Sequence, residues 1–181
     1  ATRDIEVACV IALGNITLGM ASPDLALQED DITSAEQQAE FLFNDFQDRS
    51  NPYLARAHCP RSMARLAAES DSLGDEWKTK LAESFMGVIQ ARTSTEKDAV
   101  VQSCVLALGL LGDRDSDALD KRIRKCLREA SGKNLDSQSR YFSLVSLGQV
   151  GAREGNPDDN AGVPEIQKHF LSRMVKGAGA N

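Results

Sequence analysis

Aromatic residues are scarce in this chain, and so are the features of a membrane protein or a nucleic-acid binder. Phe, Trp and Tyr make up only 5% of the 181 residues, which argues against an all-β sandwich because strands are enriched in aromatic and β-branched side chains. No apolar run approaches the roughly 18 residues that a membrane-spanning helix needs. The net charge of −6 disfavours a general nucleic-acid binder, which usually has a basic balance.

Residues for acid–base and metal chemistry are also few. The only histidines are His58 and His169, and neither stands next to a Glu. His58 precedes Cys59, but adjacent residues of a helix point about 100° apart, which does not bring a nucleophile and its base together. The chain contains no Gly-rich phosphate loop, nucleophile elbow or CxxC motif. We therefore expect a non-enzymatic protein with no catalytic residues, no cofactor and no metal.

The sequence does contain an internal repeat. Its four apolar copies are residues 4–19, 55–70, 99–115 and 138–153. They align on a small residue that follows Leu or Met, and in chain order this anchor is Gly14, Ala64, Gly109 and Gly148. The position two residues before the anchor is small as well: Ala12, Ser62, Ala107 and Ser146. The anchors lie 50, 45 and 39 residues apart, within the range of helical-pair repeats.

The cysteines follow the same register. Cys9, Cys59 and Cys104 each stand five residues before an anchor, and Ser143 takes that place in the fourth copy. A small residue there fits close helix packing. A shared metal site is not expected, because equivalent positions of stacked helices lie about 10 Å apart. Four cysteines in this pattern indicate no disulfide framework, which favours a reducing, cytoplasmic location.

Each copy is followed by a second, amphipathic helix, with apolar residues at helical spacing. The second helices are expected at residues 34–49, 75–92, 116–130 and 164–175, and the last should bury Ile166, Phe170, Leu171 and Met174. With no strand pattern, the sequence predicts an all-α fold, an α-solenoid of four helix pairs in one domain. The expected repeats are residues 4–49, 51–92, 94–131 and 136–177.

The first copy is continuously apolar over residues 7–13, like an interior repeat and unlike a polar-faced cap. We therefore expect another surface to cover it: a preceding repeat of a longer array, a partner, or a second copy of the chain. The chain also begins with Ala1 instead of Met, so a processed chain or a piece of a longer one is expected.

The repeat resembles the HEAT repeats of bacterial proteins, in particular those of the phycobilin-lyase type. The resemblance rests on the Ala-Leu-Gly cores that end at Gly14 and Gly109, on the Gly112-Asp113 exit, on Pro60 within a first helix, and on Arg56 and Arg140 eight residues before their anchors. Two copies depart from it, with Glu6 and Val101 where that Arg would stand. The resemblance implies an armadillo-like superhelix and protein binding. Its alternatives are a bilin-lyase-like enzyme or chaperone and, against the overall acidity, a nucleic-acid binder related to HEAT-like DNA glycosylases.

One acidic segment has the alternating spacing of a calcium loop, at Asp113, Asp115 and Asp117. It lacks the Gly at loop position 6 and the Glu at position 12 that such loops use, because Ala118 and Arg124 stand there. Helix capping by Asp115 or Ser116 is the simpler interpretation.

The second helices supply the candidate binding surface, since in HEAT-like stacks they line the concave face. Gln38, Phe41, Asp45 and Asp48 share one face of the first of them. A basic ridge follows on the third and fourth, at Lys121, Arg124, Lys125, Arg128, Lys168, Arg173 and Lys176. We predict a protein or peptide partner of complementary charge order, with Phe41 as an apolar anchor. The alternative is an ordinary solvated surface.

Overall fold

The computed structural model describes residues 2–16, 32–70, 72–91, 96–132 and 135–178, and within them every regular element is an α-helix. This confirms the all-α prediction. The eight helices are α1 (Thr2–Leu13), α2 (Ala35–Gln47), α3 (Tyr53–Glu69), α4 (Asp75–Gln90), α5 (Asp98–Leu111), α6 (Ala118–Ala130), α7 (Ser137–Ala152) and α8 (Gly162–Ala178). Within the same part of the chain, no helix is both long enough and apolar enough to cross a membrane.

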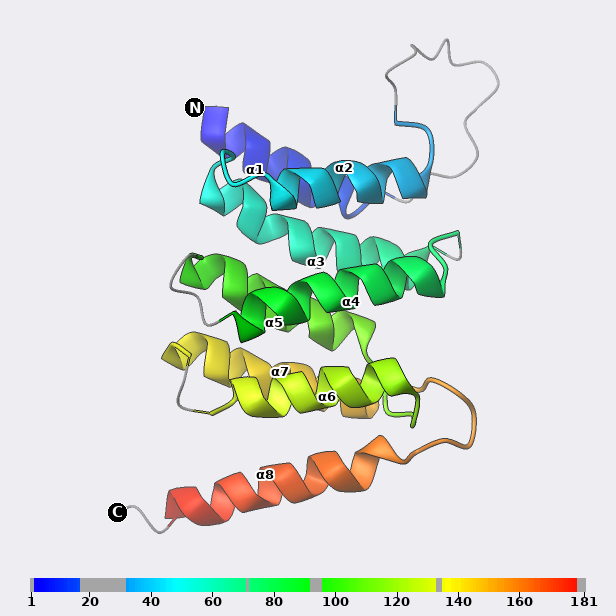
Figure 1. Cartoon of the computed structure of the whole chain (residues 1–181), viewed down its shortest axis with the longest axis vertical. Helices are drawn as coiled ribbons and strands as arrows, with labels where there is room; N and C mark the ends of the chain where they lie inside the picture. Colours follow the sequence, from blue (N-terminus) through cyan, green and yellow to red (C-terminus); the bar gives the residue numbers. More distant parts are fainter. Residues whose placement is uncertain (1, 17–31, 71, 92–95, 133–134, 179–181) are drawn as a thin grey trace.

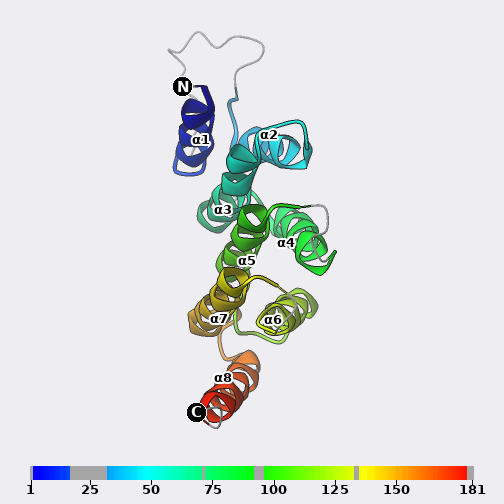
Figure 2. The same ribbon diagram turned by 90° about the vertical axis from the view of Figure 1, so that its left-hand side faces the viewer.

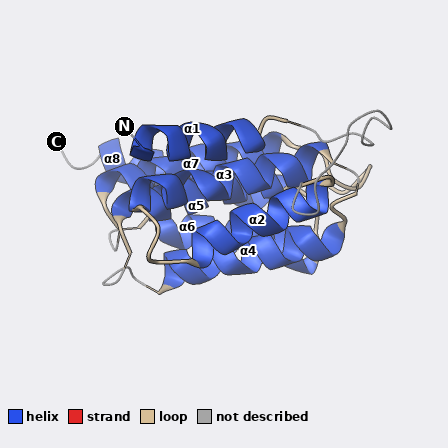
Figure 3. Cartoon of the chain, turned by 90° about the horizontal axis from the view of Figure 1, so that it is seen from above, coloured by secondary structure: helices blue, strands red, loops and turns tan. Residues whose placement is uncertain are grey.

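The helices form two layers along one axis of the molecule (Figure 1). Helices α1, α3, α5 and α7 lie one above the other, and each contacts the next. Helices α2, α4 and α6 form the second layer, seen edge-on in Figure 2 and from above in Figure 3. Each packs more extensively on the first-layer helix that follows it than on the one before. Helix α8 ends the stack and contacts α6 and α7.

Small residues hold the first layer together at the positions that the register aligns. A Cβ atom on Gly14 would lie 2.5 Å from the Cα of Ser62, and one on Gly109 would lie 2.8 Å from the Cα of Ser146. Real Cβ atoms do not approach backbone this closely, so both anchors need a glycine. The Ser62 hydroxyl also donates a hydrogen bond to the Val10 carbonyl, at 2.9 Å. At these two places the anchor of one copy therefore packs on the small residue that stands two positions before the next anchor.

Arg56, one of the arginines behind the HEAT resemblance, connects three segments. Its guanidinium makes two contacts with the Glu96 carboxylate, of 3.0 and 2.8 Å, and its Nε donates to the Phe46 carbonyl at 3.0 Å. Both side chains of this ion pair are largely buried. Paired, bidentate geometry is what makes such burial tolerable.

The cysteines differ in exposure although they share a register position. Cys59 and Cys104 are buried, and so is Ser143, whereas Cys9 is exposed. The expectation that Cys9 packs against a neighbouring helix is wrong for the described residues. Helix α1 contacts α3 on one side, and its other side, including Ile5 at 63% exposure, is open.

Helix α8 also leaves apolar residues uncovered. Ile166 is buried as expected, and Phe170 is partly buried with its ring near Gly148. Leu171 and Met174 are 62% and 70% exposed, so the prediction that they face the core is wrong. The reason is that, among the described residues, α8 packs on α6 and α7 with one face, and these two side chains lie on the other.

Candidate functional site

The structure separates the predicted binding residues into two groups. Phe41, 49% exposed, and Asp45 belong to α2 near the N-terminal end, whereas the basic residues belong to α6 and α8 near the other end (Figure 1). Lys121, Lys125 and Lys168 are exposed, as a binding surface requires.

The N-terminal group is less open than its sequence pattern indicates. The Asp45 carboxylate accepts hydrogen bonds from the Asn51 amide at 2.7 Å and from the Cys59 thiol at 3.2 Å. It is therefore partly engaged in joining α2 to α3. Gln38 is fully buried, with its amide donating to the carbonyls of Leu13 and Ile16. The expectation that Gln38 shares the open face with Phe41 is wrong.

Arg124 is not part of a solvent-facing ridge, and this prediction is wrong too. Its side chain is 1% exposed. Its Nη1 donates to the Asp113 carbonyl at 3.0 Å, and its Nε lies 3.4 Å from the Glu165 carboxylate. A buried guanidinium needs such partners. They come from the turn before α6 and from α8, which the helical pattern of α6 does not reveal.

Between α6 and α8 lies a surface cavity of about 540 Å³, which we name the α6–α8 groove. Its lining residues are Arg128, Pro164, Glu165, Lys168, His169 and Ser172. The Arg128 guanidinium pairs with Glu165 at 2.7 Å. Beside the groove, Arg173 donates to the carbonyl and hydroxyl of Ser131, at 2.8 and 2.9 Å. Three of the predicted residues thus lie in or beside one groove.

His169 lies within this cationic surrounding. Its Nε2 is 3.1 Å from the Ser131 hydroxyl. Partial burial lowers the pKa of His169, and the positive charges of Arg173 and Arg128 lower it further. The two arginines thus add a positive electrostatic potential at the ring to the effect of burial, and both disfavour the imidazolium form.

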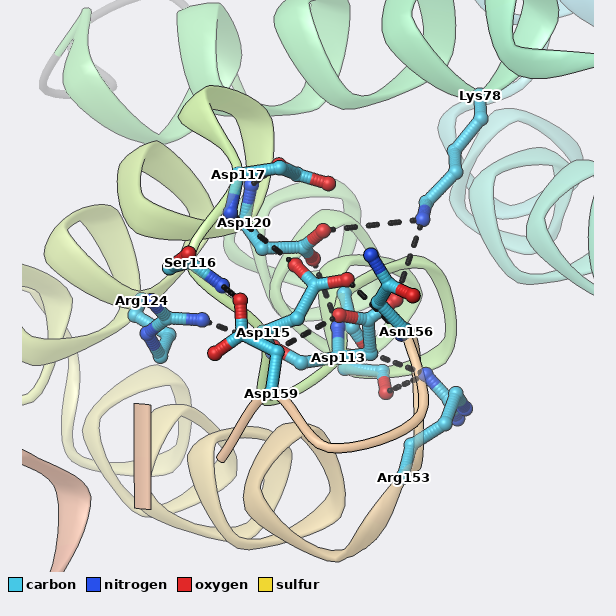
Figure 4. Close-up of polar contacts among 12 residues, drawn as sticks. Lys78, Asp113, Asp115, Ser116, Asp117, Asp120, Arg124, Arg153, Asn156 and Asp159 are labelled. Atoms are coloured by element: carbon cyan, nitrogen blue, oxygen red, sulfur yellow. Dashed lines mark hydrogen bonds and ion pairs between the residues drawn. The ribbon is translucent and has the colours of Figure 1, made fainter. Parts of the chain in front are cut away.

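A second polar cluster joins the turn before α6 to its neighbours (Figure 4). Asp113, Asp115 and Asp120 are all buried, and each offers one carboxylate oxygen within 4.8 Å of the others. Asp120 accepts from the Asp113 backbone N–H at 2.7 Å. Asp117 is the N-cap of α6, accepting from the Asp120 backbone N–H at 2.8 Å. The expected capping by Asp115 or Ser116 is therefore wrong by one or two residues.

Cationic side chains surround these carboxylates. The Lys78 ammonium, from α4, is 3.4 Å from Asp113 and 3.8 Å from Asp120. Arg124 binds the Asp113 carbonyl, and Arg153 donates to the Gly112 carbonyl at 2.6 Å. Lys78 thus pairs with two of the three carboxylates, whereas Arg124 and Arg153 bind backbone carbonyls of the same turn.

The loop between α7 and α8 closes over the same cluster. The Asn156 backbone N–H donates to Asp115 at 3.1 Å, and the Ser116 backbone N–H donates to Asp159 at 2.7 Å. A Cβ atom on Gly155 would lie 2.6 Å from an Asp115 oxygen, so glycine permits this approach. The cluster therefore ties α4, α6, α7 and the last loop into one unit. Sequence reasoning missed Lys78 and Asp120, which no motif marks.

Comparison with family models, with curated proteins and with solved structures finds no match to this chain.

Proposed function

We propose that this chain is a HEAT-like α-solenoid that serves as a non-enzymatic protein-interaction scaffold. Two features support the proposal. The first-layer helices contact their neighbours in sequence, and the same small-residue contact recurs at Gly14–Ser62 and Gly109–Ser146. In a repeat stack of this kind, extended surfaces are available to a partner. We place the partner on the surface that α2, α4, α6 and α8 present.

The observation that carries the proposal is the division of charge along the stack. Residues 1–117 contain twenty Asp and Glu against ten Lys and Arg, whereas residues 118–181 contain seven against eleven. The exposed ring of Phe41 lies near the acidic end, and Lys121, Lys125 and Lys168 lie near the basic end. A surface with opposite charge at its two ends favours a partner in one orientation.

Two triple variants with the same change in net charge test the proposal. Lys121→Glu, Lys125→Glu and Lys168→Glu reverse the basic end. Arg49→Glu, Arg61→Glu and Lys97→Glu change exposed residues elsewhere and serve as the control. Both variants and the wild type are used for quantitative cross-linking capture from an extract. We expect the specific partner to be lost from the first variant and kept by the second. Equal capture by all three proteins contradicts the proposal.

A further inference from the structure

The α6–α8 groove has more cationic than anionic side chains. Arg128 and Lys168 line it, and Arg173 stands beside it. Among its described lining residues Glu165 is the single carboxylate. That carboxylate is shared between Arg128 at 2.7 Å and the buried Arg124 at 3.4 Å. The groove therefore already holds one carboxylate through charge-assisted contacts, with positive charge left over.

Two cationic side chains of the groove are accessible to a ligand. The Arg128 side chain is 33% exposed, although its Nε is buried and has no hydrogen-bond partner among the described residues. Lys168 is exposed and makes no ion pair within the described part of the chain. Both side chains can make charge-assisted contacts with an anionic acceptor.

We propose that the α6–α8 groove binds the carboxylates of an acidic peptide segment, with Arg128 and Lys168 as its principal cationic contacts. This inference rests on the scaffold function proposed above and names the chemistry of the partner at the basic end. Arg is well suited to such contacts because its planar fork of donors matches a carboxylate.

An acidic peptide fits this groove better than a nucleic acid. Acidic side chains outnumber basic ones among the described residues before α6, and this excess repels a long polyanion that follows the stack beyond its basic end. Apart from the imidazole of His169, the described lining contains no aromatic ring on which a base could stack. A short acidic segment meets only the basic end and uses the contact type that Glu165 already makes.

His169 couples this binding to pH. Arg128 on α6 and Arg173 on α8 disfavour its protonation, while Lys168 and Glu165 lie on its own helix and Ser131 contacts its Nε2. A bound carboxylate offsets the positive potential and raises the pKa of the ring. Peptide binding therefore takes up a proton and becomes tighter as the pH falls from 8 to 6.

Calorimetric titration of the full chain at low salt, with a short peptide of alternating Glu and Gly, tests the proposal. We expect binding at pH 8 and about threefold tighter binding at pH 6. Lys168→Gln weakens binding about fivefold at both pH values, and His169→Gln removes most of the gain at pH 6. Lys97→Gln, a neutralisation of an exposed lysine outside the groove, leaves affinity within about twofold. Circular dichroism melts establish that each variant is folded.

Three results overturn the proposal. They are absence of peptide binding at pH 6, an equal loss of affinity in Lys97→Gln, and tighter binding of a single-stranded oligonucleotide of the same charge. Its failure is distinguishable from failure of the scaffold function. If the groove binds the peptide but the wild type and both triple variants capture the same partners, only the scaffold function is refuted. If the first triple variant loses the partner but the groove binds no peptide, only the proposed peptide binding by the groove is refuted.

Discussion

Asp120 has an environment unlike that of a solvated aspartate. Its side chain is fully buried, and one of its oxygens has no hydrogen-bond partner among the described residues. Burial raises the pKa of Asp120 to about 7, with the Asp117 and Asp113 carboxylates acting in the same direction. Lys78 and the Asp113 N–H act in the opposite direction. The folded chain thus holds this proton more tightly than the unfolded chain does.

Asp120→Asn should change how stability depends on pH. Because the folded-state pKa is raised, ionisation of Asp120 costs stability progressively as the pH rises from about 4 to about 7. Between pH 5 and pH 8 the wild type should lose on the order of 2 kcal/mol through this group, and the variant should not. Asn can still accept from the Asp113 N–H. Urea unfolding across this pH range measures the difference.

Asp158→Asn is the control for this experiment, because it removes an exposed carboxylate from the nearby loop. Its left-handed backbone, with φ at 75°, tolerates Asn. The free energy of unfolding could instead depend on pH in the same way in the wild type, Asp120→Asn and Asp158→Asn. In that case Asp120 is already ionised in the folded chain at pH 5, and the raised pKa is wrong.

The four thiols should differ sharply in reactivity. Cys9 is exposed, whereas Cys59, Cys104 and Cys126 are buried, and burial raises the pKa of each of those three thiols. Since the thiolate is the reactive form, Cys9 should react rapidly in the native protein and the other three after unfolding. Alkylation followed by mass spectrometry of peptides identifies the site. Labelling of Cys104 at the rate of Cys9 contradicts the packing of α5.

At the scale of elements, the first-layer helices α5 and α7 approach each other too closely for a side chain at Gly109. Gly109 lies against the backbone of Ser146 in that contact. Gly87 in α4 is also helical, but no atom lies within 4 Å of the place where its Cβ would be. The two glycines therefore separate the effect of helix packing from that of helix propensity.

Gly109→Ala should destabilise the protein, and Gly87→Ala should stabilise it. The methyl group at Gly109 forces α5 and α7 apart, at a cost of about 2 kcal/mol. At Gly87 it meets open space and gains about 0.5–1 kcal/mol, because Ala is the better helix former. Thermal unfolding of both variants gives the comparison. A stabilised Gly109→Ala protein would show that these helices are not in contact.

The sequence predicts the position and the buried face of a helix well only where the same residue pattern also shows which helices pack against it. The eight helices follow from periodicity, and the small size of Gly109 and Ser146 follows from the register, because those signals are local or repeat along the chain. The exposure of Leu171 does not, since a stripe of apolar residues does not reveal which of its members a neighbouring helix covers. The prediction that Arg124 faces solvent is wrong for a related reason. Its partners, the Asp113 carbonyl and Glu165, come from a turn and from another helix.

At the scale of the whole molecule, successive contacts and divided charge make the two ends of the stack different surfaces. Helix α1 has no contact with α5, α7 or α8 beyond the occasional residue, and Figure 1 places it at the opposite end from α8. Neighbouring packed helices are about 8–10 Å apart. Four such steps from α1 through α3, α5 and α7 to α8 therefore separate the ends by about 40 Å.

A distance measurement between those ends tests the stacked arrangement most directly. One spin label is attached to the exposed Cys9 of α1, and the other to a cysteine introduced by Leu171→Cys on the exposed side of α8. Pulsed electron paramagnetic resonance should give a distribution centred near about 40 Å. A distribution centred below about 25 Å, as in a closed bundle where α1 and α8 pack within one or two helix diameters, would contradict the account.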